Sequence, residues 1–155
     1  MDFHETLAKL TRHPLFKDWH AANKTHFLAH AFVLLDDANK DTWQIGFYNP
    51  EDEKMITFVM TPPGIQHTPP QEVLKSEAII EPLRPEEVTL SVDDALLVAK
   101  KCFDENYHAE KAVKQFFIIQ TLEGKPVFNL TYLTQSFKTI NMKIDAKNGT
   151  ILKHT

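Results

Sequence analysis

SVDDALLVAKKCFDENY, residues 91–107, predicts one amphipathic helix. Ser91 is a residue type that caps helices, and Asp94 stands three residues later, in the position of a capping box. The helix should end near Asn106. Its apolar residues recur at three- and four-residue spacing, the pattern of a single helix face: Val92, Ala95, Leu96, Ala99, Cys102, Phe103 and Tyr107.

An antiparallel β-meander is expected directly after this helix. Strands are predicted over residues 116–121, 127–133 and 137–145, with a short last strand beginning at Ile151. The turns between them contain Glu123-Gly124-Lys125-Pro126 and residues 145–149, where Gly149 can supply a positive φ. The second part of the chain is therefore a helix on an antiparallel sheet.

The first part of the chain shows a similar order. Residues 2–23 predict a helix that Pro14 interrupts and restarts. Three strand-like runs come next, over residues 28–35, 43–48 and 55–60, and the middle one alternates with a period of two. Both parts of the chain thus predict an α+β protein.

A proline-rich stretch separates the two parts and is expected to be a connector. Proline removes a backbone donor and resists both helices and central strands. We expect one short edge strand near residues 78–80, and three segments: an N-terminal unit over residues 1–61, a connector over 62–90 and a C-terminal unit over 91–155. The prolines are Pro62, Pro63, Pro69, Pro70, Pro82 and Pro85.

The two units match at an offset of about 85 residues. Trp43 then falls on Phe128 and Phe47 on Tyr132, with a first turn of equal length. One interpretation is a tandem duplication of the helix-plus-meander unit. The other is coincidence, because β-meanders share strand and turn lengths. Whether the two units would share one sheet is left open.

Three segments of the second unit resemble PepSY modules: residues 91–99, the aromatic strand at 127–132 and the close at 143–152. The resemblance implies helices packed on curved antiparallel sheets, a PepSY-like or cystatin-like arrangement. It also implies a non-catalytic module, associated in that family with peptidase regulation and with cell-envelope proteins. This chain shows no peptidase domain and no evident signal or anchor, and no functional residue of the family is carried over to it.

Composition excludes several classes of function. The formal net charge is −4 and no dense basic block occurs, so neither nucleic acid nor a membrane surface is an expected partner. No apolar run approaches the length of a membrane span. Cys102 is the only cysteine, which rules out an internal disulfide and fits a cytoplasmic location. A secreted chain whose signal has been removed would look similar.

Sequence motifs for metal binding, cofactor binding and catalysis are weak. We therefore expect no metal site, no cofactor and no catalytic residues. His26 and His30 are four residues apart, but no glutamate follows His26 as in zinc peptidases. Cys102 falls on the apolar helix stripe, which predicts a buried side chain rather than a nucleophile. The acidic pair Asp36 and Asp37 falls in a predicted turn, where solvated carboxylates are usual.

Aromatic residues are the candidate binding residues. Most should be core, but a curved sheet under a helix can also present a concave apolar face. The favoured hypothesis is a non-enzymatic binding or regulatory module that recognises a peptide or protein through its sheet face or edge. The alternatives are a small-ligand carrier or small enzyme, and a homodimer through a sheet edge. The candidate residues are Trp43, Phe47, Phe128, Tyr132 and Phe137.

Overall fold

The computed structural model describes residues 2–72 and 79–155. Within them lie three α-helices, one 3-10 helix and nine strands. The first unit comprises α1 (Phe3–Arg12), α2 (Pro14–Ala22), β1 (Phe27–Leu34), β2 (Trp43–Asn49), β3 (Lys54–Thr61), β4 (Gly64–His67) and β5 (Gln71–Glu72). The remainder comprises η1 (Pro85–Glu87), α3 (Val92–Asn106), β6 (Ala112–Leu122), β7 (Lys125–Thr134), β8 (Thr139–Asp145) and β9 (Ile151–His154).

Each of the three α-helices begins at a side-chain cap. Asp2 accepts a hydrogen bond from the backbone of Glu5, and Ser91 accepts one of 3.1 Å from Asp94, which confirms the predicted start of α3. The ring of His13 caps α2, whose first residue is Pro14. Local sequence therefore determines where the helices begin.

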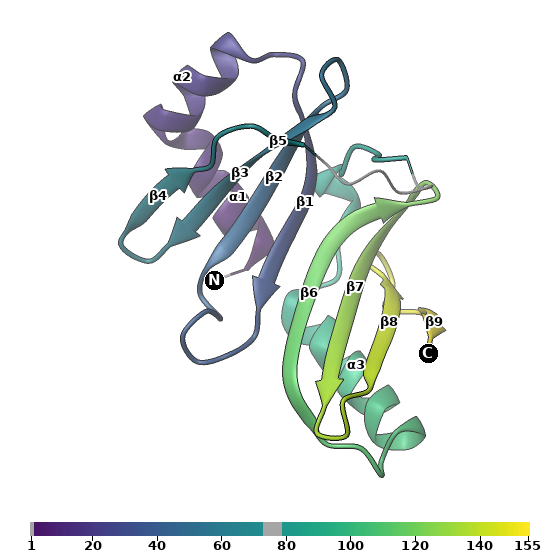
Figure 1. The fold of residues 1–155 in the computed structure, drawn as a ribbon. Helices are drawn as coiled ribbons and strands as arrows, with labels where there is room; N and C mark the ends of the chain where they lie inside the picture. The colour runs from purple at the N-terminus through teal and green to yellow at the C-terminus, as the bar shows by residue number, and fades with distance from the viewer. Residues whose placement is uncertain (1, 73–78) are drawn as a thin grey trace.

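The described strands form one antiparallel sheet in the order β4-β3-β2-β1-β6-β7-β8-β9, with β5 also paired to β3 (Figure 1). The two units meet where β1 pairs with β6, from His30 opposite Gln120 to Leu34 opposite Phe116. The two units therefore share one sheet, and the α+β class predicted from sequence is confirmed.

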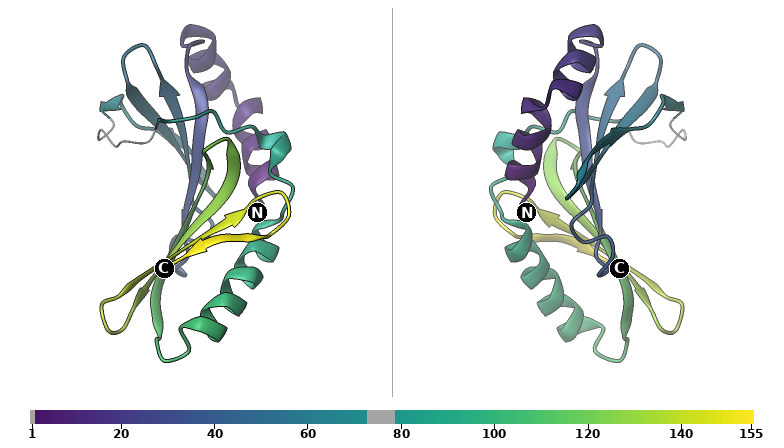
Figure 2. Two further views of the ribbon diagram at one scale, coloured as in Figure 1. Left: turned by 90° about the vertical axis from the view of Figure 1, so that its right-hand side faces the viewer. Right: turned by 90° about the vertical axis from the view of Figure 1, so that its left-hand side faces the viewer.

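All three α-helices pack on one face of this sheet, and the sheet curves so that its other face is concave (Figure 2). The core lies between the helices and the sheet. Leu10 of α1 and Ala99 of α3 are fully buried there against strand residues such as Phe58, Phe117 and Leu130. We call the opposite face, which no described helix covers, the open face.

The described parts of the connector, residues 62–72 and 79–90, contain more regular structure than their composition predicts. Pro62 and Pro63 lie in a tight turn that returns the chain as β4 along β3, so part of residues 62–90 extends the sheet. Farther on, Leu83 is buried and its backbone donates a 2.8 Å hydrogen bond to Leu28. The prediction of an edge strand near residues 78–80 is wrong for Ile79 and Ile80, which belong to no strand. Ala78 lies outside the described residues.

Candidate functional site

Four of the five predicted aromatic residues lie in the core. Trp43, Phe47, Phe128 and Tyr132 are 1–5% exposed and face the helices. The ring of Tyr132 lies 4.8 Å from that of Phe103 in α3, and burial raises the pKa of its hydroxyl to about 12. In this structure their side chains are thus covered by helices, and a role in binding stays a prediction.

Phe137 lies apart from the other four. It is 99% exposed in the turn between β7 and β8, with a φ of 65° that non-glycine residues rarely adopt. The structure therefore does not bring the five aromatic residues to one surface.

A different set of side chains occupies the open face. Partners in the sheet register point to the same face, and one row crosses five strands: Gln44, Phe32, Ile118, Asn129 and Lys143. Phe32 also lies 5.7 Å from the ring of Phe116. The face is apolar where β1 meets β6 and becomes polar and basic toward β8.

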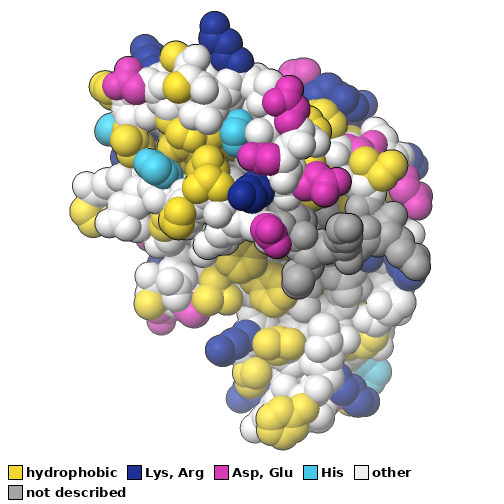
Figure 3. Space-filling model, turned by 45° about the horizontal axis from the view of Figure 1, so that its top comes forward, with side chains coloured by type: hydrophobic (Ala, Val, Ile, Leu, Met, Phe, Trp, Pro, Cys, Tyr) yellow, Lys and Arg dark blue, Asp and Glu magenta, His cyan; other side chains and the backbone are white. Residues whose placement is uncertain are grey.

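Two hollows lie on this face and share Ile79, Glu81 and Leu122. The first, about 440 Å³, is lined by β1 and β6 residues that include His30, Phe32 and Ile118. The second, about 1040 Å³, lies over β7, β8 and β9. Figure 3 shows hydrophobic side chains gathered in a recess of the surface. We call the two hollows together the open-face groove, a concave and largely apolar site of the kind that binds ligands.

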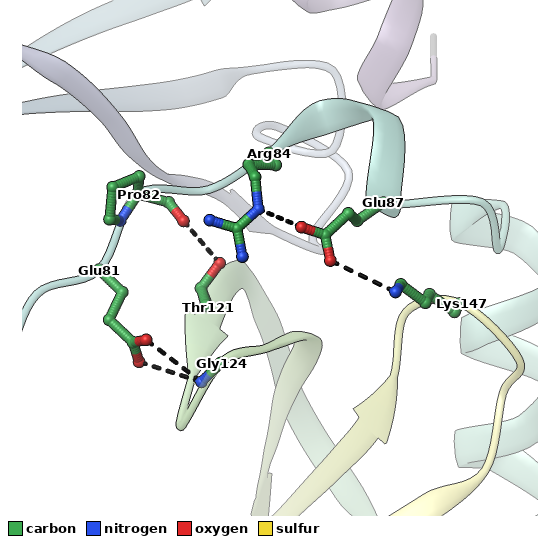
Figure 4. Close-up of polar contacts among 7 residues, drawn as sticks. All are labelled: Glu81, Pro82, Arg84, Glu87, Thr121, Gly124 and Lys147. Atoms are coloured by element: carbon green, nitrogen blue, oxygen red, sulfur yellow. Dashed lines mark hydrogen bonds and ion pairs between the residues drawn. The ribbon is translucent and has the colours of Figure 1, made fainter.

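The connector forms one wall of the groove and is fixed to the sheet by hydrogen bonds (Figure 4). The carboxylate of Glu81 accepts from the backbone of Gly124 in the β6–β7 turn, at 3.2 and 3.3 Å. The hydroxyl of Thr121 donates to the carbonyl of Pro82 at 2.9 Å. These bonds hold the connector residues that come after Ile80 against the hairpin, so this part of the wall is built into the fold.

A second polar cluster anchors the connector farther along. Glu87 pairs with Arg84 in the 3-10 turn and with Lys147 in the β8–β9 turn, at 3.3 Å from the latter (Figure 4). The hydrogen bond from Arg84, helped by Lys147, lowers the pKa of Glu87. Because all three groups are near the surface, we assign them a positioning role and only a small contribution to stability.

His30 is the titratable group on the apolar floor. Its ring covers Gly46 on β2, where a Cβ would lie 2.7 Å from His30 Nε2, so only glycine leaves room for the ring. Burial lowers the pKa of His30 and favours the neutral imidazole. His26 lines a different hollow, beside Phe16 and His20, and the described residues contain no group of three metal-binding side chains.

The contact between His30 and Gly46 gives a prediction for stability. Gly46→Ala should lower the free energy of unfolding by about 1–3 kcal/mol, because the methyl group overpacks the site. The same change made in a His30→Ala background should cost much less, since the colliding ring is gone. Urea unfolding of the four proteins measures the coupling, and equal costs in both backgrounds would contradict the packing.

The lowered pKa of His30 gives a prediction for pH dependence. The unfolded chain binds a proton near pH 6.5, whereas the folded chain binds it only at lower pH. Stability contributed by this group is therefore present above pH 6.5 and is lost as the pH falls toward the lowered value. Urea midpoints measured from pH 8 to pH 5 should fall less for His30→Gln than for the wild type, and parallel curves would refute the assignment.

A hydrogen-bonded network adjoins the groove on the β7–β8 side of the open face. The amide of Asn141 donates to Asn129 and Thr131 at 2.6 and 3.1 Å, and Lys143 Nζ donates to Asn141 Oδ1 at 2.9 Å. The sequence alternation places Asn141 and Lys143 opposite the apolar residues of their strand, but it does not show that they border a hollow. The signal that could have found them is this polar alternation on adjacent strands.

Comparison with known proteins gives one structural match. No family model matches the chain, and no curated protein matches it significantly. A crystal structure described as a "putative lipoprotein" from Clostridium difficile 630 is similar at a TM-score of 0.60 and 15% identity. The match covers 91% of this chain and 89% of the neighbour's chain, so the likeness extends over both units of the sheet. It concerns the fold alone. None of the described helices is long and apolar enough to cross a membrane.

Proposed function

We propose that this chain is a non-enzymatic binding module that holds an extended peptide segment of a partner protein in the open-face groove. The observation that carries the proposal is the floor formed by Phe32 and Ile118, which is apolar but lies outside the helix-covered core. Burying such a surface under a ligand is favourable by roughly 25 cal/mol per Å². A peptide is the expected occupant because polar side chains flank the apolar floor along the groove.

The sheet edges support binding at the face rather than at an edge. The outer strands β4 and β9 have four residues each, and β5 has two. A strand added at such an edge would form few backbone hydrogen bonds. Pairing with a partner strand, or with a second copy of the chain, is therefore the less favoured mode.

We also propose that the two units are tandem PepSY-like modules joined edge to edge. In both units a helical segment is followed by antiparallel strands. When the first unit is shifted by 85 residues, the sequence of β1 aligns with that of β6 and the sequence of β2 with that of β7. Trp43 and its counterpart Phe128 both face the helices. A regulatory role toward a peptidase and a cytoplasmic location stay predictions. The structural neighbour is described as a "putative lipoprotein". Fractionation of source cells tests the location.

A peptide array of apolar segments tests the proposed function. Ile118→Thr should weaken binding of the retained peptides several-fold, because it removes apolar floor from the groove. Val113→Thr is the matched control: it is on the same strand, also β-branched and 58% exposed, and it does not line the groove. Binding that responds equally to both variants, or no binding at all, would refute the proposal.

A small apolar molecule is the second candidate ligand. The hollow beside His30 has a volume of about 440 Å³, within the usual range for small-molecule sites. A thermal-shift screen of a compound library distinguishes the two. Compounds that stabilise the wild type but not Ile118→Thr, together with a negative peptide array, would favour the carrier function.

A further inference from the structure

The β8–β9 end of the open-face groove is basic. Lys125, Lys143 and Lys153 all line the larger hollow, together with the apolar side chains of Val127 and Leu152. Each lysine ammonium group is cationic and carries three hydrogen-bond donors. The groove therefore joins an apolar floor to a cationic end.

Two of these lysines stand directly opposite each other. Lys143 in β8 pairs in register with Lys153 in β9, and like charges at such positions destabilise a sheet. Four ion pairs occur among the described residues, and none of them includes Lys125, Lys143 or Lys153. The repulsion at this end is thus not offset by any described ion pair.

Two acidic side chains line this hollow, and a third, Asp145, lies two residues along β8 from Lys143 and accepts a hydrogen bond from the backbone of Lys147. Of the two that line the hollow, Glu81 is bonded to the backbone of Gly124, and Glu123 lies in the β6–β7 turn. Lys143 uses one of its three donors on Asn141, which fixes the ammonium group at the groove, and it donates no other hydrogen bond among the described residues. An anion bound between Lys143 and Lys153 would satisfy donors and relieve the repulsion.

We infer that the bound peptide carries a carboxylate, from Asp, Glu or its own C-terminus, that binds between Lys143 and Lys153 while its apolar part covers Phe32 and Ile118. This inference rests on the proposed function and specifies the partner as an apolar segment with an acidic residue at one end. The charge complementarity of the basic end selects this partner over a purely apolar one.

The test is a peptide array in which each apolar segment is made with Glu and with Gln at successive positions. Glu peptides should bind the wild type about tenfold more tightly than their Gln counterparts, and the preference should shrink with salt. In the Lys143→Gln/Lys153→Gln protein the ratio should approach one. Lys24→Gln/Lys101→Gln is the control, because it removes the same charge from exposed sites outside the groove.

Each outcome of the array is decisive. Binding that depends on Ile118 but shows no preference for Glu overturns the carboxylate site and leaves the proposed function standing. A Glu preference that survives in the Lys143→Gln/Lys153→Gln protein also overturns the site, whereas no binding at all overturns both. Without peptide, Lys153→Gln should unfold at the same or a higher temperature than the wild type, and a clear loss of stability would contradict the unrelieved repulsion.

Discussion

Phe117→Ala should lower the free energy of unfolding by about 3–5 kcal/mol, the usual cost of removing a buried phenylalanine. Phe117 is 1% exposed on β6, at the strand pair that joins the two units. Its ring lies 5.8 Å from Trp43 in the first unit and 5.9 Å from Phe128 in the second. The cavity would therefore affect the packing of both units at once.

Phe116→Ala is the matched control for this prediction. It is the same change at the neighbouring residue, whose half-buried side chain lies on the open face. It should cost less, about 1–2 kcal/mol, because less apolar area leaves water on folding. Urea unfolding followed by circular dichroism and by tryptophan fluorescence should give coincident transitions for both variants. Separate transitions, or equal costs, would contradict a core shared across β1 and β6.

A fragment of residues 89–155 should fail to fold as a monomer. Removing the first unit exposes the edge of β6 from Phe116 to Gln120, which β1 pairs in the full chain, and uncovers Phe117 where it meets Trp43. Long apolar strand edges pair with other chains rather than remain in water. We expect an unfolded chain or an associated species in light scattering, with no monomeric cooperative transition.

The full chain, purified and measured in the same way, is the control for the fragment. A monomeric fragment that unfolds cooperatively would show that the second unit is an independent domain, as the predicted boundary at residue 91 implies. It would also remove the argument that β1 is needed to complete the sheet.

Local signals make much of the fold predictable. Ser91 and the apolar stripe after it determine α3, and Gly124 and Gly149 adopt the positive φ that their turns require. The pairing of β1 with β6 is not predictable from sequence. Its partners are far apart in the chain, from His30 opposite Gln120 to Leu34 opposite Phe116, and neither local sequence pattern indicates the contact. The β4 edge strand escapes prediction because Pro62 and Pro63 indicate a turn but not the pairing of the next residues with β3.

The candidate site is harder to predict than the fold. Alternation in residues 43–48 separates two faces but does not say which one the helices cover. The bulky face, with Trp43 and Phe47, forms the core, and the groove lies on the other face beside His30 and Gly46. The wall near Glu81 depends on a long-range bond to Gly124 that no sequence pattern specifies.

Methyl NMR during titration with the tightest-binding array peptide tests the central claim most directly. The open-face groove predicts shift changes for Ile118, Leu122 and Leu152, which line it, and little change for Ile119, Leu130 and Ile144, which lie under the helices. Changes confined to the second set, or to residues of α1–α3, would show that the peptide binds elsewhere and would contradict the proposal.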